Sequence, residues 1–474
     1  MKRSIFCLLI ICALLFQSCG VIVINESKIK GTNEITDITS DVSEDTDIPK
    51  EDPVLSSEDL KKQADAYLED VAKFSFENEI IKVFTTDDTF LIGSGEETLI
   101  NSDRIARLKA VEEKFDMTFH TVLTSSETAY NTVKAEYNSG TAPGHFFALP
   151  ADVTAALVGD GFLKSLRTSP YFDENAEYLN SAVSAFTVGN DIFAASGDGC
   201  FEPDKITALY YNKTDLEALG LTPVSSHVSD GTWTYDKFYE YLKSAENYEG
   251  TILVDKTEEE FDKQLLFSSF KFSNNLPDKP VRLLTFDGKL NTVCGGISKL
   301  LEFTPKKDGD FSSGDVLFML DSLNIPDSFA TTKDVWSIAP LPKATEDDEH
   351  MSFISLDAVV LSIPETTSSE IGLGALIMGI NAASSGHVIQ RYIDRYMNYT
   401  LRDNGAVTAL NILIENVNYD FAYSFSSSYK NLDKYTLSAY EQILKGKLDY
   451  GQYVENYKKE SEEYLDRYFP ATYY

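Results

Sequence analysis

The stretch from Ile206 to Glu246 constrains the fold more than any other part of this 474-residue chain, because it contains a strand and the helices that follow it. A β-branched and aromatic run ends at Asn212 and Lys213, and it predicts a buried strand that closes into a turn. A short leucine-rich helix follows, and Gly220 marks its end. The chain is therefore expected to pass directly from a strand into a helix here.

A second helix is predicted after a polar loop. Thr234 stands at the N-cap position, and Asp236 lies in the first turn, where a negative charge is favourable. Apolar side chains then recur at the spacing of one helix face, at Phe238, Tyr241, Leu242 and Ala245. A second amphipathic helix is therefore expected here.

The order of these elements resembles the second-lobe entry of extracellular solute-binding proteins, the receptors of ABC importers, in their large carbohydrate-type branch. The resemblance is carried by a strand ending in Tyr-Tyr-Asn-Lys, a helix ending in Leu-Gly-Leu and a helix opened by Thr-Trp-Thr-Tyr-Asp. Val335 to Pro342 (VWSIAPLP) also resembles an apolar strand of that family, which ends in a Pro-Leu-Pro turn. Lys237 departs from the family, which more often has an acid there that completes a capping box.

The resemblance spans roughly Glu79 to Phe469 and implies an α/β, two-lobed periplasmic-binding-protein-like fold of type II. Parallel-rich sheets flanked by helices would form each lobe, and the ligand cleft would lie between the lobes. It also implies a monomer without a cofactor that delivers a solute to ABC permease subunits. Trp336 is expected to pack inside the second lobe.

The first residues predict where the chain is located. Lys2 and Arg3 precede an apolar run that gives way to Ser18-Cys19-Gly20, which resembles a lipoprotein signal with Cys19 as the lipidated residue. The alternative is an uncleaved anchor, because Val21 to Ile24 could extend the run to about 20 residues. Both interpretations place the rest of the chain outside the membrane, on the outer face of the cell membrane.

A tether is predicted after the signal. Residues 25–59 are rich in Glu, Asp, Thr, Ser and Lys and lack aromatic side chains, so they bury too little apolar surface to fold. The domain prediction is then a signal peptide at 1–19, a disordered acidic tether at 20–59, a first lobe at 60–205 and 357–390, and a second lobe at 206–356 and 391–474.

Composition limits the partners. The chain is 43% hydrophobic, which is enough for large cores, and its formal net charge of −34 argues against nucleic acid as a partner. Outside the signal only Cys200 and Cys294 remain, with no CxxC spacing, so no zinc site is expected. The two cysteines either pair with each other or stay free and buried.

Strands and helices alternate in the first lobe. Strands are expected at Glu79–Thr86, Thr118–Leu123 and Gly144–Leu149, with helices between them, which indicates a parallel sheet covered on both faces. A helical segment is expected over Leu163–Thr187. In open α/β sheets the ligand lies outside the carboxyl ends of the strands, so a cleft is predicted there.

The candidate ligand-binding residues follow from this rule and from the two places where the chain crosses between lobes. Asp152 has a rival role as the N-cap of its helix, and Phe90 has one as a core residue. A plain surface loop would account equally well for Phe201 and Asp204. The full set is Asp88, Phe90, Asp152, Phe201, Asp204, Asp321 and Asp357.

No catalytic or metal-binding motif is present in the sequence, since it has no P-loop, GxSxG, HExxH or GxGxxG and its five His are scattered. The predicted function is a surface lipoprotein that captures a solute, a sugar or oligosaccharide by the resemblance, and passes it to a permease. A surface sensor or adhesion subunit with the same fold is one alternative. A glycoside hydrolase is another, because it needs only two suitably spaced carboxylates.

Overall fold

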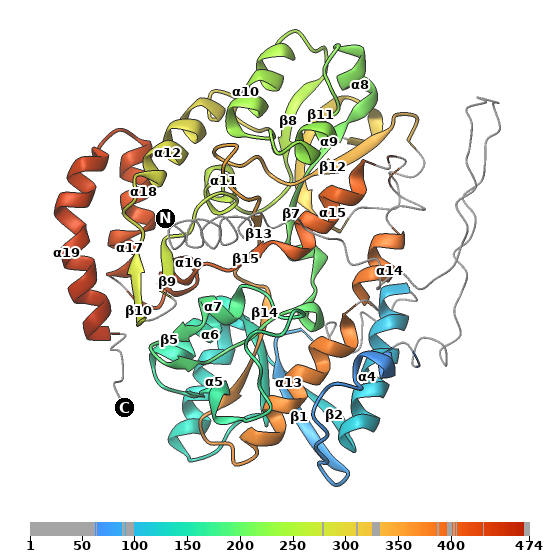
Figure 1. Cartoon of the computed structure of the whole chain (residues 1–474), viewed down its shortest axis with the longest axis vertical. Coiled ribbons are helices and arrows are strands. Elements are labelled where there is room, and N and C mark those ends of the chain that lie inside the picture. The colour runs from blue at the N-terminus through green and yellow to red at the C-terminus, as the bar shows by residue number, and fades with distance from the viewer. Residues whose placement is uncertain are drawn as a thin grey trace, which may run out of the picture. The chain divides into compact units, whose positions relative to one another are not determined.

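The computed structural model describes residues 62, 64–87, 91, 99–276, 279–309, 311–324, 332–385, 388–395, 401, 403, 405–429 and 431–468. By its contacts the chain divides into the units Met1–Lys50 and Glu51–Tyr474, and every described residue belongs to the second unit. Two large sheets lie in this unit, one at the centre of each lobe (Figure 1).

The sheet of the first lobe has the strand order β2-β1-β3-β14-β4. The strands β2, β1 and β3 are parallel, whereas β14, which comes from much later in the chain, is antiparallel to both of its neighbours. Their bounds are β1 (Glu79–Thr85), β2 (Met117–Leu123), β3 (Phe146–Pro150), β4 (Leu163–Lys164) and β14 (Val359–Pro364).

Helices cover both faces of this sheet. Successive side chains of a strand point to opposite faces, and here apolar side chains point to both, so both faces must be covered. Val83 and Phe146 belong to a core with α4 (Leu99–Phe115) and α13 (Glu370–Ser384). The neighbouring Phe84 and Phe147 point to the other face and pack with α5 (Ser126–Asn138) and α6 (Ala151–Gly159). Within the described part, the helical run Glu370–Asp394 is long and apolar enough to cross a membrane, but 88% of its apolar window is buried, as in a core helix.

The sheet of the second lobe has the order β12-β7-β11-β8. The central strand β7 is antiparallel to β11 and β12, and β11 is parallel to β8. Trp233 and Trp336 are both buried in this lobe, the latter as expected. The strands are β7 (Thr207–Asn212), β8 (Thr251–Asp255), β11 (Val316–Ser322) and β12 (Trp336–Ala339), and the helices are α8 (Lys213–Ala218), α9 (Val224–Ser229), α10 (Tyr235–Ser244), α11 (Phe261–Phe267) and α12 (Lys289–Leu300).

Two crossing segments connect the lobes and run antiparallel to each other. Ile206 forms a β-bridge with Ile354, and the N–H of Ser355 donates to the carbonyl of Lys205 at 2.9 Å. We call residues 198–206 the first crossing and residues 354–358 the second crossing. Beside them, the short strands β13 (Ser352–Phe353) and β15 (Val417–Asn418) pair in parallel.

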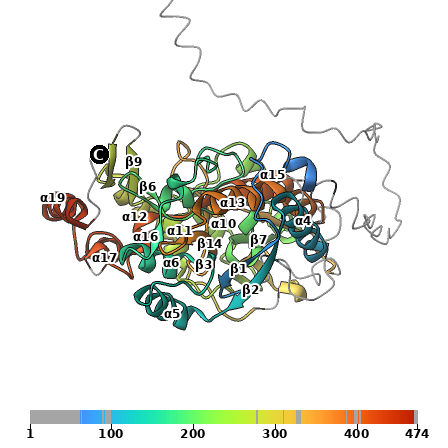
Figure 2. The ribbon, with the colours of Figure 1, turned by 90° about the horizontal axis from the view of Figure 1, so that it is seen from below.

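The end of the chain packs against both lobes. The helix α15 lies on β12, α16 lies on α6 of the first lobe, and α18 lies on α12 of the second. Figure 2 shows α19 and α4 at opposite ends of the described structure. The remaining elements are α7 (Ala182–Ala185), β5 (Thr187–Val188), β6 (Asp191–Ile192), β9 (Ser273–Leu276), β10 (Lys279–Leu284), α14 (Val388–Arg395), α15 (Ala406–Glu415), α16 (Phe421–Phe425), α17 (Leu432–Tyr435), α18 (Leu437–Leu444) and α19 (Tyr450–Tyr468).

Several local predictions can be judged directly. The Thr234 N-cap is confirmed, because its hydroxyl oxygen accepts the N–H of Lys237 at 3.3 Å. The predicted N-cap role of Asp152 is wrong, since Pro150 occupies that position and Asp152 lies inside the first turn of α6. The long helix expected over Leu163–Thr187 is also wrong, because the only α-helix in that range is α7. Cys200 and Cys294 are free and buried.

Candidate functional site

A cavity of about 460 Å³ lies where the crossing segments meet the second lobe, and we call it the cleft cavity. The parallel strands β8 and β11 end at it, and β7 begins there because it runs in the opposite direction. Ligands of open α/β sheets lie at such carboxyl ends. The lining consists of Asp204, Lys205, Ile206, Thr207, Lys256, Thr257, Glu258, Glu259, Asp321, Ser322, Phe353, Ser355 and Asp357.

The loop after β8 supplies four of these residues, and a buried hydrogen-bond network fixes its shape. Asp255, at the end of β8, accepts both the N–H and the hydroxyl of Thr257, at 2.9 and 2.6 Å. The amide of Gln264 donates to the Thr257 hydroxyl and to the carbonyl of Glu259. Because Asp255 and Gln264 are almost fully buried, the loop presents Glu258 and Glu259 from a rigid base.

An ion pair closes one side of the cavity and joins the two crossings. The ammonium of Lys205 lies 2.7 Å from the Asp357 carboxylate and 3.4 Å from that of Asp204. Partial burial acts against the charged ammonium, but the hydrogen bond to Asp357 and the nearby carboxylates outweigh it and raise the pKa of Lys205. Lys205 is therefore a fixed cation of the crossing segments.

The two oxygens of Glu259 are held by different parts of the chain. The hydroxyl of Ser355, in the second crossing, donates to one oxygen at 2.9 Å, and that of Tyr423, in α16, donates to the other at 3.4 Å. The Tyr423 ring is stacked on Phe267 with centroids 4.4 Å apart. Glu259 thus enters the cavity with its carboxylate orientation set by both neighbours.

Two half-buried aspartates occupy matching places in the two lobes. Asp321 lies near the end of β11, and Asp152 lies two residues after the end of β3, in the first turn of α6. Each accepts the N–H of the next residue with Oδ1, Asp321 from Ser322 at 2.7 Å and Asp152 from Val153 at 2.6 Å. Burial raises the pKa of both carboxyls.

The predicted site residues are placed as follows. Asp204, Asp321 and Asp357 line the cleft cavity together. Asp152 is not a lining residue but lies beside the second crossing, since its N–H donates to the carbonyl of Leu356 and its carboxyl interacts with the lining residue Asp357. Phe201 is buried against Tyr392 with ring centroids 4.9 Å apart. Asp88, Phe90 and Cys19 lie outside the described residues.

Sequence reasoning missed several cavity residues, namely Lys205, Lys256, Glu258, Glu259 and Ser355. The omission of the β8 loop has a clear cause, because no strand was predicted at Thr251–Asp255. The apolar residues Ile252, Leu253 and Val254 after Gly250 are a strand signal that would have placed this loop at a carboxyl end.

Within the first crossing, the buried Glu202 attaches this segment to the start of β14. It is 6% exposed, and its carboxylate accepts the N–H of Val359 at 2.7 Å. Burial raises the pKa of Glu202 to about 8. Nearby, the guanidinium of Arg104 donates to the carbonyl of Phe201 at 2.8 Å and so attaches the first crossing to α4.

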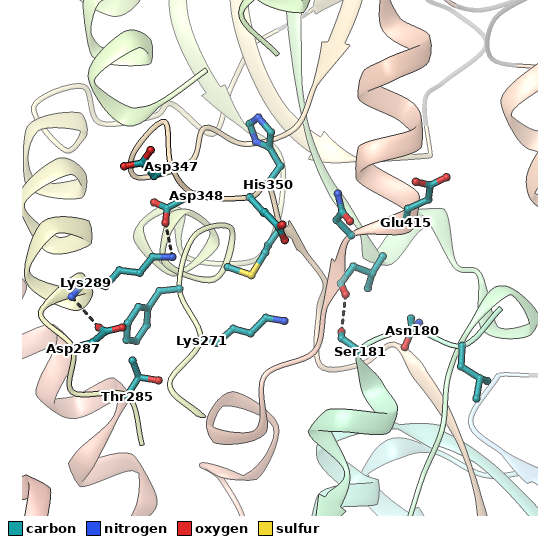
Figure 3. A pocket seen from close by; sticks show the side chains of 16 residues that line it. Asn180, Ser181, Lys271, Thr285, Asp287, Lys289, Asp347, Asp348, His350 and Glu415 are labelled. Atoms are coloured by element: carbon teal, nitrogen blue, oxygen red, sulfur yellow. Dashed lines mark hydrogen bonds and ion pairs between the residues drawn. The ribbon is translucent and has the colours of Figure 1, made fainter. Parts of the chain in front are cut away.

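A second cavity of about 650 Å³ is lined by a different set of residues (Figure 3). Asn180 and Ser181 line one wall, and Lys271 and Lys289 stand on the other. Some polar groups of each wall already bind one another. Lys289 forms a 2.7 Å ion pair with Asp348 on one wall, and the Ser181 hydroxyl donates to the carbonyl of Val417 on the other. The cleft cavity is the stronger candidate because strands of the second lobe end in it.

No protein-family model matches the sequence, and no curated protein matches it. Solved structures match over most of the chain. The sugar-binding protein MalE from the phytopathogen Xanthomonas citri is 12% identical, with a TM-score of 0.51 over 82% of this chain and 98% of that chain. The cyclic alpha-maltosyl-1,6-maltose binding protein from Arthrobacter globiformis is 11% identical, with a TM-score of 0.50 over 82% and 99% of the two chains. The chain therefore has the two-lobed α/β fold that the sequence predicted.

Proposed function

We propose that this protein is a cell-surface lipoprotein that captures a solute by lobe closure and delivers it to the permease of an ABC importer. The cleft cavity carries the proposal, because it lies at the ends of β8 and β11 and is walled by both crossing segments. A ligand bound there touches the second lobe and the segments that lead to the first, so its binding energy can favour the closed arrangement.

A sugar or oligosaccharide is the favoured class of solute. Carboxylates that accept hydroxyl hydrogen bonds surround the cavity, and its volume suits a ligand of a few rings. The two similar solved structures are described as binding proteins for sugars, which supports the same class here. Binding without hydrolysis, action as a monomer and a location outside the membrane belong to the same proposal.

The test combines a glycan panel with small-angle scattering. The protein without its first 59 residues is screened against neutral and charged mono- and oligosaccharides by thermal shift and calorimetry. We expect at least one glycan to bind, to lower the radius of gyration and to yield no new reducing ends. Binding with an unchanged radius would contradict the closure mechanism, and turnover abolished by replacing one acid would favour the hydrolase alternative.

Two substitutions locate the binding site within the same experiment. Asp152→Ala and Asp321→Ala each remove one acceptor at the lobe junction, and truncation of a paired polar group costs about 1–3 kcal/mol, or roughly tenfold to a hundredfold in affinity. Asp230→Ala, at an exposed helix end, is the control. Wild-type affinity in both cleft variants would exclude this cavity as the site.

A further inference from the structure

The cleft cavity contains more carboxylates than ammonium groups. Its charged lining residues are Asp204, Glu258, Glu259, Asp321 and Asp357 on one side of the balance and Lys205 and Lys256 on the other. To infer the charge of a ligand, we first ask which of these charged groups already have a partner within the protein.

Lys205 is already used within the protein. Its ammonium is in ion-pair contact with both Asp204 and Asp357, so one positive charge is shared by two carboxylates, and these three groups together keep one negative charge. Glu259 has a hydroxyl donor on each oxygen, from Ser355 and Tyr423. These hydrogen bonds orient the Glu259 carboxylate but do not neutralise it, so the cavity lining keeps an excess of negative charge.

Asp321 has a different environment. One of its oxygens accepts the N–H of Ser322, and among the described residues no ion pair is formed with its carboxylate. The exposed Lys256 lowers its pKa from a distance and Asp255 raises it, but burial dominates and the net effect is a raised pKa. The anionic form of Asp321 is thus poorly compensated in the second lobe.

Asp152 repeats this arrangement in the first lobe. Its Oδ1 accepts the N–H of Val153, and no ion pair with a described cation is formed. The neighbouring charge is Asp357, which has the same sign and raises the pKa of Asp152 further than burial does alone. One carboxylate without an ion pair to a described cation therefore lines the cavity from the second lobe, and another lies beside the second crossing in the first lobe.

We propose that the solute bound in the cleft carries a protonated amine, as an amino sugar with a free amino group does, and that Asp152 and Asp321 supply its counter-charge from the two lobes. This inference rests on the proposed function and narrows its class of solute. Closure removes water from the cleft, and enclosed carboxylates that lack a cation are costly. A neutral sugar would donate hydrogen bonds to them but would leave their charge uncompensated.

Aromatic stacking gives little support for a neutral sugar at this cavity. Phe353 is the one aromatic residue among the described lining residues, and it is 1% exposed. Ring stacking is a main source of binding energy for the apolar faces of sugars. Among the described residues, charge and hydrogen bonding therefore carry the recognition.

Matched pairs of probes test the inference. Glucosamine is compared with N-acetylglucosamine, and the β-1,4-linked disaccharide of each is compared in the same way, by calorimetry at low and high salt. We expect the free amine to bind roughly tenfold or more tighter at low salt, with the advantage reduced at high salt. Asp152→Asn and Asp321→Asn keep the shape and remove the charge, so each should remove most of the preference, whereas Asp230→Asn should keep it.

The two proposals fail differently. Equal or tighter binding of the N-acetylated partner would overturn the amine inference and leave solute capture intact. Binding of neither partner would also overturn it, while the broader glycan panel with scattering judges solute capture separately. A preference for the amine that persists in both Asp→Asn variants would overturn the assignment of these two carboxylates.

Discussion

Glu202 is the buried group whose replacement tests the structure most directly. Its side chain, in the first crossing, is 6% exposed and accepts the N–H of Val359, and burial raises its pKa to about 8. Glu202→Gln keeps the size of the side chain and an oxygen that accepts the same N–H. The substitution therefore removes the titration while leaving the packing and this hydrogen bond in place.

The expected magnitude follows from proton linkage. Between the ordinary Glu pKa of 4.5 and the folded value of about 8, the folded state keeps a proton that the unfolded state has lost. The contribution of Glu202 to the free energy of unfolding therefore falls as the pH rises, by about 1.4 kcal/mol per pH unit. From pH 5.5 to 7.5 the wild type should lose about 3 kcal/mol relative to Glu202→Gln.

Urea unfolding at pH 5.5, 6.5 and 7.5 measures this difference. Wild type and Glu202→Gln are compared with Glu217→Gln, which replaces an exposed acid on α8 and should follow the wild type at every pH. The stability of Glu202→Gln relative to the wild type should rise steadily over this range. Parallel curves for all three proteins would refute the argument that Glu202 is buried and protonated in the folded state.

Three further outcomes are expected. Cys19→Ala should release the protein from membranes, because the thioether to the lipid forms at that thiol; mature Cys19→Ala protein that still sediments with membranes would exclude the lipoprotein signal. Gly197→Ala should destabilise by about 1–3 kcal/mol, since its Cβ would overlap the carbonyl oxygen of Tyr178; an unchanged urea midpoint would contradict that contact. Thr234→Ala should cost about 1 kcal/mol through the lost cap to Lys237, which Thr234→Ser should largely retain.

Strands and helix caps that depend only on neighbouring residues could be predicted from the sequence. The run that became β7 and the cap at Thr234 both depend on neighbouring residues alone. The helix expected over Leu163–Thr187 failed for a local reason as well. Side chains of Asp173 and Asn180 accept backbone N–H groups two residues later, and such bonds compete with a helix.

The candidate site was predictable only where it follows a strand or a crossing. Asp321 lies near the end of an apolar strand that the sequence pattern predicts, and Asp204 and Asp357 lie at the crossings. Glu259 was not predictable in its role, because one of its two hydroxyl donors, Tyr423, lies 164 residues later in the chain. No periodicity in the sequence reports on a contact of that kind.

The position of the cavity residues determines what each substitution can reveal. Lys205 and Asp357 line the cavity and also join the two crossings through their ion pair, so replacing either one changes the link between the crossings and the cavity lining together. Asp321 lies outside the crossing segments, on β11, and forms no ion pair to them among the described residues, whereas the carboxyl of Asp152, on α6, interacts with Asp357 of the second crossing. Under the proposed closure, affinity changes in Asp321 variants therefore report on ligand contacts, whereas changes in Lys205, Asp357 or Asp152 variants would also contain the free energy of closure.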